Sequence, residues 1–122
     1  MVRSWEEIRE TYQGFVESGL ELKPMLKLVE SIQKSPYADG LYAWTSMHDL
    51  CIVQSPVTYP YDGPYLRISP QFNGKVEFRY IDTHVESKQW HRTESEDELF
   101  PRLEGFINQL HWFVKERTVN DS

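Results

Sequence analysis

The sequence predicts an α+β fold with an N-terminal helical hairpin, an antiparallel four- to five-stranded meander sheet, and a long C-terminal helix packed on one sheet face. Apolar residues near both ends of the chain recur at three- and four-residue steps, as in amphipathic helices. Between them, residues 41–81 hold aromatic and β-branched runs separated by turn residues. The strands are grouped rather than alternating with helices, which favours α+β over a parallel sheet. We treat residues 1–122 as one domain and expect residues 118–122 to form a disordered tail.

Two short helices are predicted at the N-terminus. Ser4 and Glu7 have the spacing of a capping box, and Gly19 is suited to end the first helix. Pro24 fits the first turn of the second helix, and Pro36 closes it. The apolar stripes of the two helices consist of Trp5, Ile8, Tyr12, Phe15 and Val16, and of Met25, Leu28, Val29 and Ile32.

The sheet is predicted from short runs bounded by turns. These runs cover residues 41–44, 50–54, 65–69 and 75–81, with a weaker run within 84–92. In the run 75–81 the apolar Val76, Phe78 and Tyr80 alternate with charged residues. Such alternation predicts a sheet with one buried face and one face in contact with water.

The C-terminal helix is predicted over residues 96–117. Its apolar stripe consists of Leu99, Leu103, Phe106, Ile107, Leu110, Phe113 and Val114. Pro101 conflicts with a helix capped at Ser95, because a proline at the sixth helical position removes a backbone hydrogen bond. We therefore favour a start nearer Asp97 or Glu98.

Composition narrows the functional classes. The net charge of −6 argues against nucleic acid as a partner, because phosphate contacts require a basic surface. No run approaches the about 18 apolar residues of a membrane span, and the N-terminus lacks the apolar core of a secretory signal. Cys51 is the only cysteine, which excludes an intramolecular disulfide. We expect a cytoplasmic protein without a membrane or nucleic-acid partner. The motifs of dinucleotide, P-loop and zinc-protease sites are absent, so no cofactor is expected.

Two groups of residues raise the question of catalysis or metal binding. Asp82, His84 and Glu86 alternate and would share one face of a strand, with His91 as a fourth ligand. The spacing is looser than in known sites, so we interpret them as a polar strand end and expect no metal. Cys51 follows His48 and Asp49 closely, but it lies in an apolar run typical of a buried strand. We predict that it is not a nucleophile.

The strongest candidate binding surface is aromatic and basic. A proline-rich loop carries tyrosines, and arginines follow on the strands: Tyr59, Tyr61, Tyr65, Arg67, Arg79 and Arg92. Tyrosine and arginine are enriched at binding hot spots. The alternative is that the rings pack the loop against the sheet while the arginines pair with nearby carboxylates.

Three functional hypotheses remain open. The first is a small, non-enzymatic protein of the adaptor, chaperone-like or immunity type that binds a protein partner or a second copy of itself. The second is a small-ligand-binding domain that uses the aromatic loop and the basic sheet face. The third is an enzyme with a histidine and carboxylate site.

Overall fold

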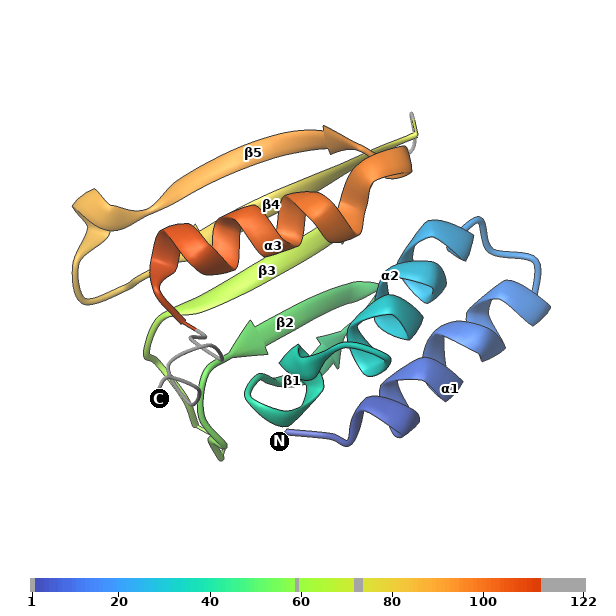
Figure 1. The fold of residues 1–122 in the computed structure, drawn as a ribbon, viewed down its shortest axis with the longest axis horizontal. Coiled ribbons are helices and arrows are strands. Elements are labelled where there is room, and N and C mark those ends of the chain that lie inside the picture. Colours follow the sequence, from blue (N-terminus) through green and yellow to red (C-terminus); the bar gives the residue numbers. More distant parts are fainter. Residues whose placement is uncertain (1, 59, 72–73, 113–122) are drawn as a thin grey trace, which may run out of the picture.

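The computed structural model describes residues 2–58, 60–71 and 74–112, and it has the α+β architecture predicted from the sequence (Figure 1). Its sheet is an antiparallel meander in the order β1-β2-β3-β4-β5. The strands are β1 (Tyr42–Ser46), β2 (Asp49–Val53), β3 (Tyr65–Pro70), β4 (Lys75–Ile81) and β5 (Trp90–Ser95).

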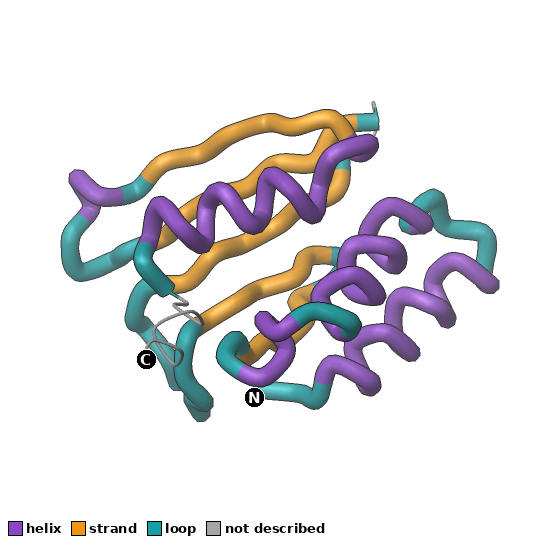
Figure 2. Tube along the Cα trace, viewed as in Figure 1, coloured by secondary structure: helices purple, strands orange, loops and turns teal. Residues whose placement is uncertain are grey.

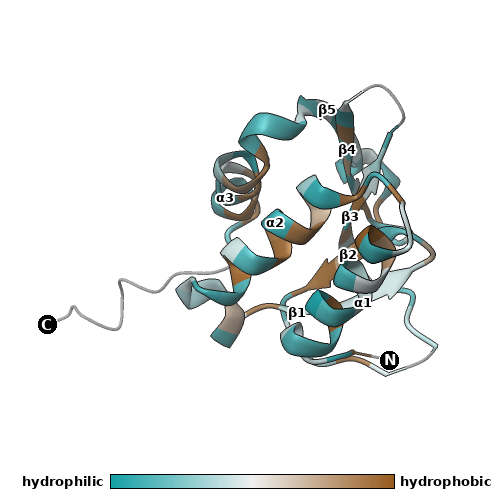
Figure 3. Ribbon diagram, turned by 90° about the vertical axis from the view of Figure 1, so that its right-hand side faces the viewer, coloured by the Kyte–Doolittle hydropathy of each residue, from teal (hydrophilic) through white to brown (hydrophobic). Residues whose placement is uncertain are grey.

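In the described part of the chain, three α-helices accompany the sheet: α1 (Trp5–Glu17), α2 (Lys23–Gln33) and α3 (Leu99–Leu110). Short 3-10 segments lie at Pro36–Asp39, Glu86–Lys88 and Glu96–Glu98. Helices α2 and α3 lie on the same side of the sheet, while α1 packs against α2 at the β1 side (Figures 2 and 3). None of the helices in the described ranges has the length and apolar character needed to cross a bilayer.

The core lies between the sheet and the helices. Alternate residues of the strands point into it, as the pattern in residues 75–81 predicted. Phe78 on β4 and Phe106 on α3 meet with ring centroids 5.0 Å apart, and Trp90 on β5 lies 4.9 Å from Phe106. The fully buried side chains include Ile8, Tyr12, Met25, Leu28, Ile32, Leu50, Ile52, Leu66, Ile68, Phe78 and Leu103.

The helix ends follow from local chemistry. The capping box of α1 is present: the Glu7 amide donates to Ser4 Oγ at 3.1 Å, and the Ser4 amide donates to Glu7 Oε1 at 3.1 Å. Helix α3 begins at Leu99, which puts Pro101 in its first turn, where no backbone N–H partner is required. The favoured later start is therefore found.

Two predicted boundaries were wrong. Helix α3 ends at Leu110 rather than continuing to residue 117, because His111 adopts a left-handed conformation with φ 59°. Phe113 and Val114 of the predicted stripe lie outside the described residues, and so does the expected tail at residues 118–122. The fifth strand begins at Trp90 rather than near His84. Asp82 Oδ1 accepts hydrogen bonds from the His84 and Val85 amides and so turns the chain, and the 3-10 segment Glu86–Lys88 follows before the strand.

Replacement of Leu103 by alanine tests the packing of α3. Leu103 is fully buried, so Leu103→Ala should lower the free energy of unfolding by about 2–5 kcal/mol through lost contacts and a cavity. Urea denaturation measures this. Gln109→Ala, on the exposed side of the same helix, is the matched control and should change stability by less than about 0.5 kcal/mol. Equal unfolding midpoints for the two variants would contradict the packing described.

Candidate functional site

The sheet surface turned away from α2 and α3 carries the residues with the most functional interest. We call this surface the open face. Strand pairing places Trp44, Cys51, Arg67, Arg79 and His91 opposite one another across all five strands. The rows on either side add Tyr42, Asp49, Val53, Tyr65, Ser69, Glu77, Ile81 and Thr93. The open face therefore combines aromatic residues toward β1 with charged residues toward β5.

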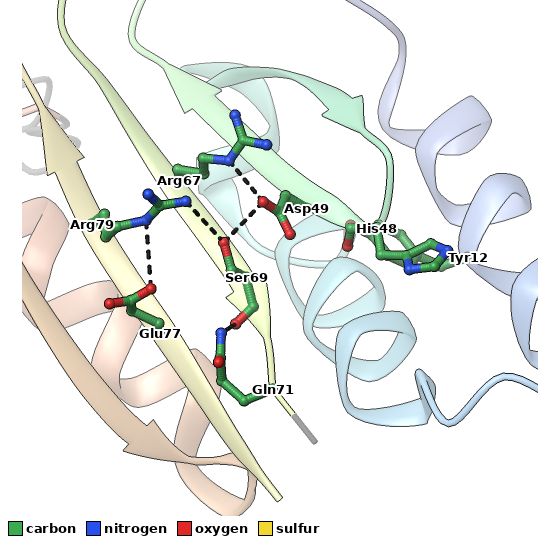
Figure 4. Close-up of polar contacts among 8 residues, drawn as sticks. All are labelled: Tyr12, His48, Asp49, Arg67, Ser69, Gln71, Glu77 and Arg79. Atoms are coloured by element: carbon green, nitrogen blue, oxygen red, sulfur yellow. Dashed lines mark hydrogen bonds and ion pairs between the residues drawn. The ribbon is translucent and has the colours of Figure 1, made fainter. Parts of the chain in front are cut away.

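Asp49 organises the polar part of the open face (Figure 4). Its Oδ2 accepts a hydrogen bond from Arg67 Nε at 2.7 Å and another from Ser69 Oγ at 2.9 Å. The Arg67 and Asp49 side chains are 23% and 19% exposed, so this ion pair is partly shielded from water. Burial lowers the pKa of Arg67, while hydrogen bonds to Asp49 and Tyr65 outweigh that effect and raise it. Arg67 is therefore a fixed positive charge.

Arg79 extends this network to the neighbouring strand. Its Nη2 donates to Ser69 Oγ at 3.3 Å, and its Nε lies 3.5 Å from Glu77 Oε1. That Nε is buried and has no hydrogen-bond partner among the described residues. The side chain as a whole is 39% exposed. Because a guanidinium offers five N–H donors, Arg79 retains donors for an external acceptor.

Two aromatic residues, Trp44 and Tyr65, lie beside the arginines with their rings 5.5 Å apart, and we call this pair the aromatic shelf. The rings of Trp44 and Tyr61 are 6.3 Å apart. The Tyr61 hydroxyl donates to the Pro64 carbonyl oxygen at 2.7 Å. A Cβ at Gly63 would lie 2.6 Å from that hydroxyl, so any larger residue there would displace the Tyr61 ring. Tyr61 therefore shapes the loop and also contacts the shelf, while Trp44 and Tyr65 remain half-buried.

A groove lies at one end of the open face. It has a volume of about 1030 Å³, and its lining residues come from the α1–α2 connection, the β1–β2 turn and the β3–β4 connection. Leu20 and Met47 bring exposed apolar surface to it, at 40% and 86% exposure. Met47 has φ 56°, an uncommon conformation for a residue with a side chain. Asp49 and Arg67 also line the groove, so it is continuous with the polar network.

The β1–β2 turn beside the groove is held by helix α1. The Tyr12 hydroxyl donates to the His48 carbonyl oxygen at 2.9 Å, and the Phe15 and His48 rings are 4.9 Å apart. Burial raises the pKa of Tyr12, which keeps this hydroxyl a donor. These contacts fix the turn and so position Asp49 at the start of β2.

The candidate binding residues are brought together in part. Tyr61, Tyr65, Arg67 and Arg79 all lie on or against the open face. Arg92 does not, because its alternation on β5 directs it to the helical side, with its guanidinium carbon 5.4 Å from the Trp90 ring centroid. Tyr59 lies outside the described residues.

The residues weighed as metal ligands are dispersed among other contacts. Asp82 caps a turn, and His84 Nε2 lies 3.6 Å from Asp62. Glu86 lies in a 3-10 segment, and His91 Nδ1 lies 3.7 Å from Glu77. Within the described ranges, no three histidine, cysteine or acidic side chains are arranged to hold a metal ion.

Cys51 lies within the open-face row but is fully buried. Burial raises the pKa of its thiol from 9.0 to about 11, more than the nearby arginines lower it. The thiol is therefore protonated near neutral pH, which disfavours nucleophilic chemistry.

Trp44, Ser69 and Met47 were not among the candidate site residues predicted from the sequence, and Asp49 was considered only as a neighbour of Cys51. The signal that would have found Asp49 is the two-residue turn, which pairs Ser46 with Asp49 and so starts β2 there. No family model matches the chain, and no curated protein or solved structure matches it either.

Cys51 should react slowly with thiol reagents. Its burial and raised pKa leave little accessible thiolate at pH 7, so Ellman's reagent should label the native protein far more slowly than the protein in guanidinium chloride. Because the thiolate fraction increases with pH up to the pKa, the native rate should also increase between pH 7 and 9. Rapid labelling of the native protein at pH 7 would contradict the burial described.

Proposed function

We propose that this chain is a small, non-enzymatic binding protein whose open face binds a protein partner. The observation that carries the proposal is the juxtaposition of the Trp44 and Tyr65 shelf with Arg67 and Arg79. Tryptophan, tyrosine and arginine are the residues that most often dominate binding energy at protein interfaces. They lie here on a sheet surface opposite the one packed against α2 and α3.

The chemistry of the open face favours one kind of partner segment. Arg67 and Arg79 pair with Asp49, Ser69 and Glu77, and these contacts hold the two guanidinium groups in place. A side chain that is already held loses less entropy on binding. The remaining donors suit a carboxylate, and the adjacent rings suit an apolar side chain. We therefore expect a partner segment with an acidic residue close to an apolar one.

A second candidate function is small-ligand binding in the groove. Its volume of about 1030 Å³ is at the upper end of the usual range for ligand pockets, and Leu20 and Met47 supply apolar surface. In that case Met47→Ser would abolish thermal stabilisation by the ligand, whereas Arg79→Glu would preserve it.

Reversal of one charge on the open face tests the protein-binding proposal. We compare three immobilised proteins: wild type, Arg79→Glu and Lys27→Glu. Each is incubated with the same cell lysate, and the proteins that it retains are quantified by mass spectrometry. Lys27 is exposed on α2, so Lys27→Glu makes the same charge change at a distance from the open face. The partner should be retained by wild type and Lys27→Glu, and its affinity for Arg79→Glu should fall by about tenfold or more.

Circular dichroism establishes that both variants are folded before the comparison. Tyr65→Ser, which shortens the aromatic shelf, should weaken retention of the same partner. The proposal is wrong if no protein distinguishes wild type from Arg79→Glu and Tyr65→Ser while both variants remain folded.

A further inference from the structure

The two edges of the sheet are not equivalent. The outer edge of β1 is covered by the N-terminal segment: the Arg3 amide donates to the Ala43 carbonyl oxygen at 2.8 Å, and the Trp5 indole N–H donates to the Leu41 carbonyl oxygen at 3.1 Å. Strand β5 lies at the opposite edge (Figure 1) and pairs only with β4 in the described part of the chain. An edge strand presents backbone groups that can pair with another chain.

A hydrogen bond at the start of the β4–β5 ladder shows which backbone groups of β5 point away from β4. The Glu96 amide donates to the Gly74 carbonyl oxygen at 3.3 Å. Gly74 and Glu96 are therefore the next pair of the β4–β5 ladder, and they form a hydrogen-bonded pair. In antiparallel strands such positions alternate, so the backbones of Trp90, Arg92 and Glu94 turn toward β4. The backbone groups of His91, Thr93 and Ser95 therefore point away from the sheet.

The Arg92 side chain supports this assignment. Its Nη1 donates to the His91 carbonyl oxygen at 2.9 Å, so that carbonyl is free of the ladder and accepts a side-chain donor instead. Apart from this bond, the guanidinium lies over the Trp90 ring. Arg92 has no ion pair with a carboxylate in the described residues.

We propose that the chain forms a symmetric dimer in which the β5 strands of two copies pair antiparallel, with the two-fold axis at Thr93. The outward groups of Thr93 then bond those of Thr93 in the second copy, and His91 pairs with Ser95 of the second copy. Arg92 lies directly opposite Glu94 of the second copy, in a non-hydrogen-bonded pair whose side chains are close.

The charges near β5 favour this register. Glu94 Oε1 lies 3.2 Å from Arg102 Nε, and Glu98 Oε1 lies 3.1 Å from Arg102 Nη2. Arg102 is one cation for the two carboxylates of Glu94 and Glu98, so these three residues carry one excess negative charge. Arg92 of the second copy would neutralise that charge. A shift of the register by two residues would keep the same backbone groups in the hydrogen bonds between the two copies. It would place Arg92 opposite Arg92 of the second copy, or Glu94 opposite Glu94, and like charges directly opposite each other are destabilising.

Such a dimer would have a continuous sheet across both copies. Because the two-fold axis is perpendicular to the sheet, both α3 helices lie on one side and both open faces on the other. The open faces of the two copies would then form one wider surface. His91 and Thr93 lie at the β5 margin of each open face and would be at the centre of this surface. The dimer is independent of the proposed function and does not require it.

Cysteine crosslinking at the two-fold axis tests the proposal. Wild-type protein at submillimolar concentration should sediment at twice the 14.5 kDa of the chain. Thr93→Cys should form a covalent dimer under mild oxidation, because the Cα atoms of a hydrogen-bonded pair are about 5.5 Å apart, within disulfide range. His91→Cys is the matched control on the same strand and face. Its two copies would be about 14 Å apart and should not crosslink.

Charge exchange checks the register by a second route. Arg92→Glu would place two carboxylates opposite each other and should shift the protein to monomer, while Arg92→Glu with Glu94→Arg should restore the dimer. Circular dichroism confirms the fold of each variant. The proposal is overturned if the wild type is a monomer at submillimolar concentration. It is equally overturned if a dimer persists in Arg92→Glu, or if Thr93→Cys crosslinks no better than His91→Cys.

Discussion

Burial of one face of the sheet beneath α2 and α3 determines which side chains reach each surface of the molecule. Phe78 on β4 packs against Phe106 on α3, and this contact lies within an apolar layer to which every strand contributes. Side chains alternate along a strand, so a residue committed to this layer directs its neighbours to the open face. The position of Arg67 and Arg79 on the open face follows from the burial of Leu66, Ile68 and Phe78.

The polar network of the open face depends on strand register as well as on burial. Asp49 begins β2 because the two-residue turn before it pairs Ser46 with Asp49, and α1 holds that turn through the Tyr12 hydroxyl. Asp49 can then bind Arg67 and Ser69 of β3 together. The helical hairpin, which is far from the arginines in sequence, therefore positions the carboxylate that holds them.

Sequence patterns were sufficient for the elements with strong local signals. The capping box at Ser4 and the alternation through Val76 and Phe78 are set by neighbouring residues, and both are found in the structure. The site was harder to predict, because contacts such as Asp49 with Ser69 join residues that are far apart in sequence. The edge strand β5 was misplaced because its exposed residues lack a buried alternation, so the sequence did not reveal on which side of the sheet Arg92 lies.

The aromatic and basic side of the sheet is accessible to a partner, whereas the opposite side is closed by α2 and α3. Hydroxyl-radical footprinting with mass spectrometry measures this accessibility residue by residue. Trp44 and Tyr65 are half-buried on the open face, whereas Tyr12 and Phe78 are fully buried. We expect oxidation of Trp44 and Tyr65 in the native protein, with Tyr12 and Phe78 oxidised only after denaturation. Protection of Trp44 and Tyr65 equal to that of Phe78 would contradict it.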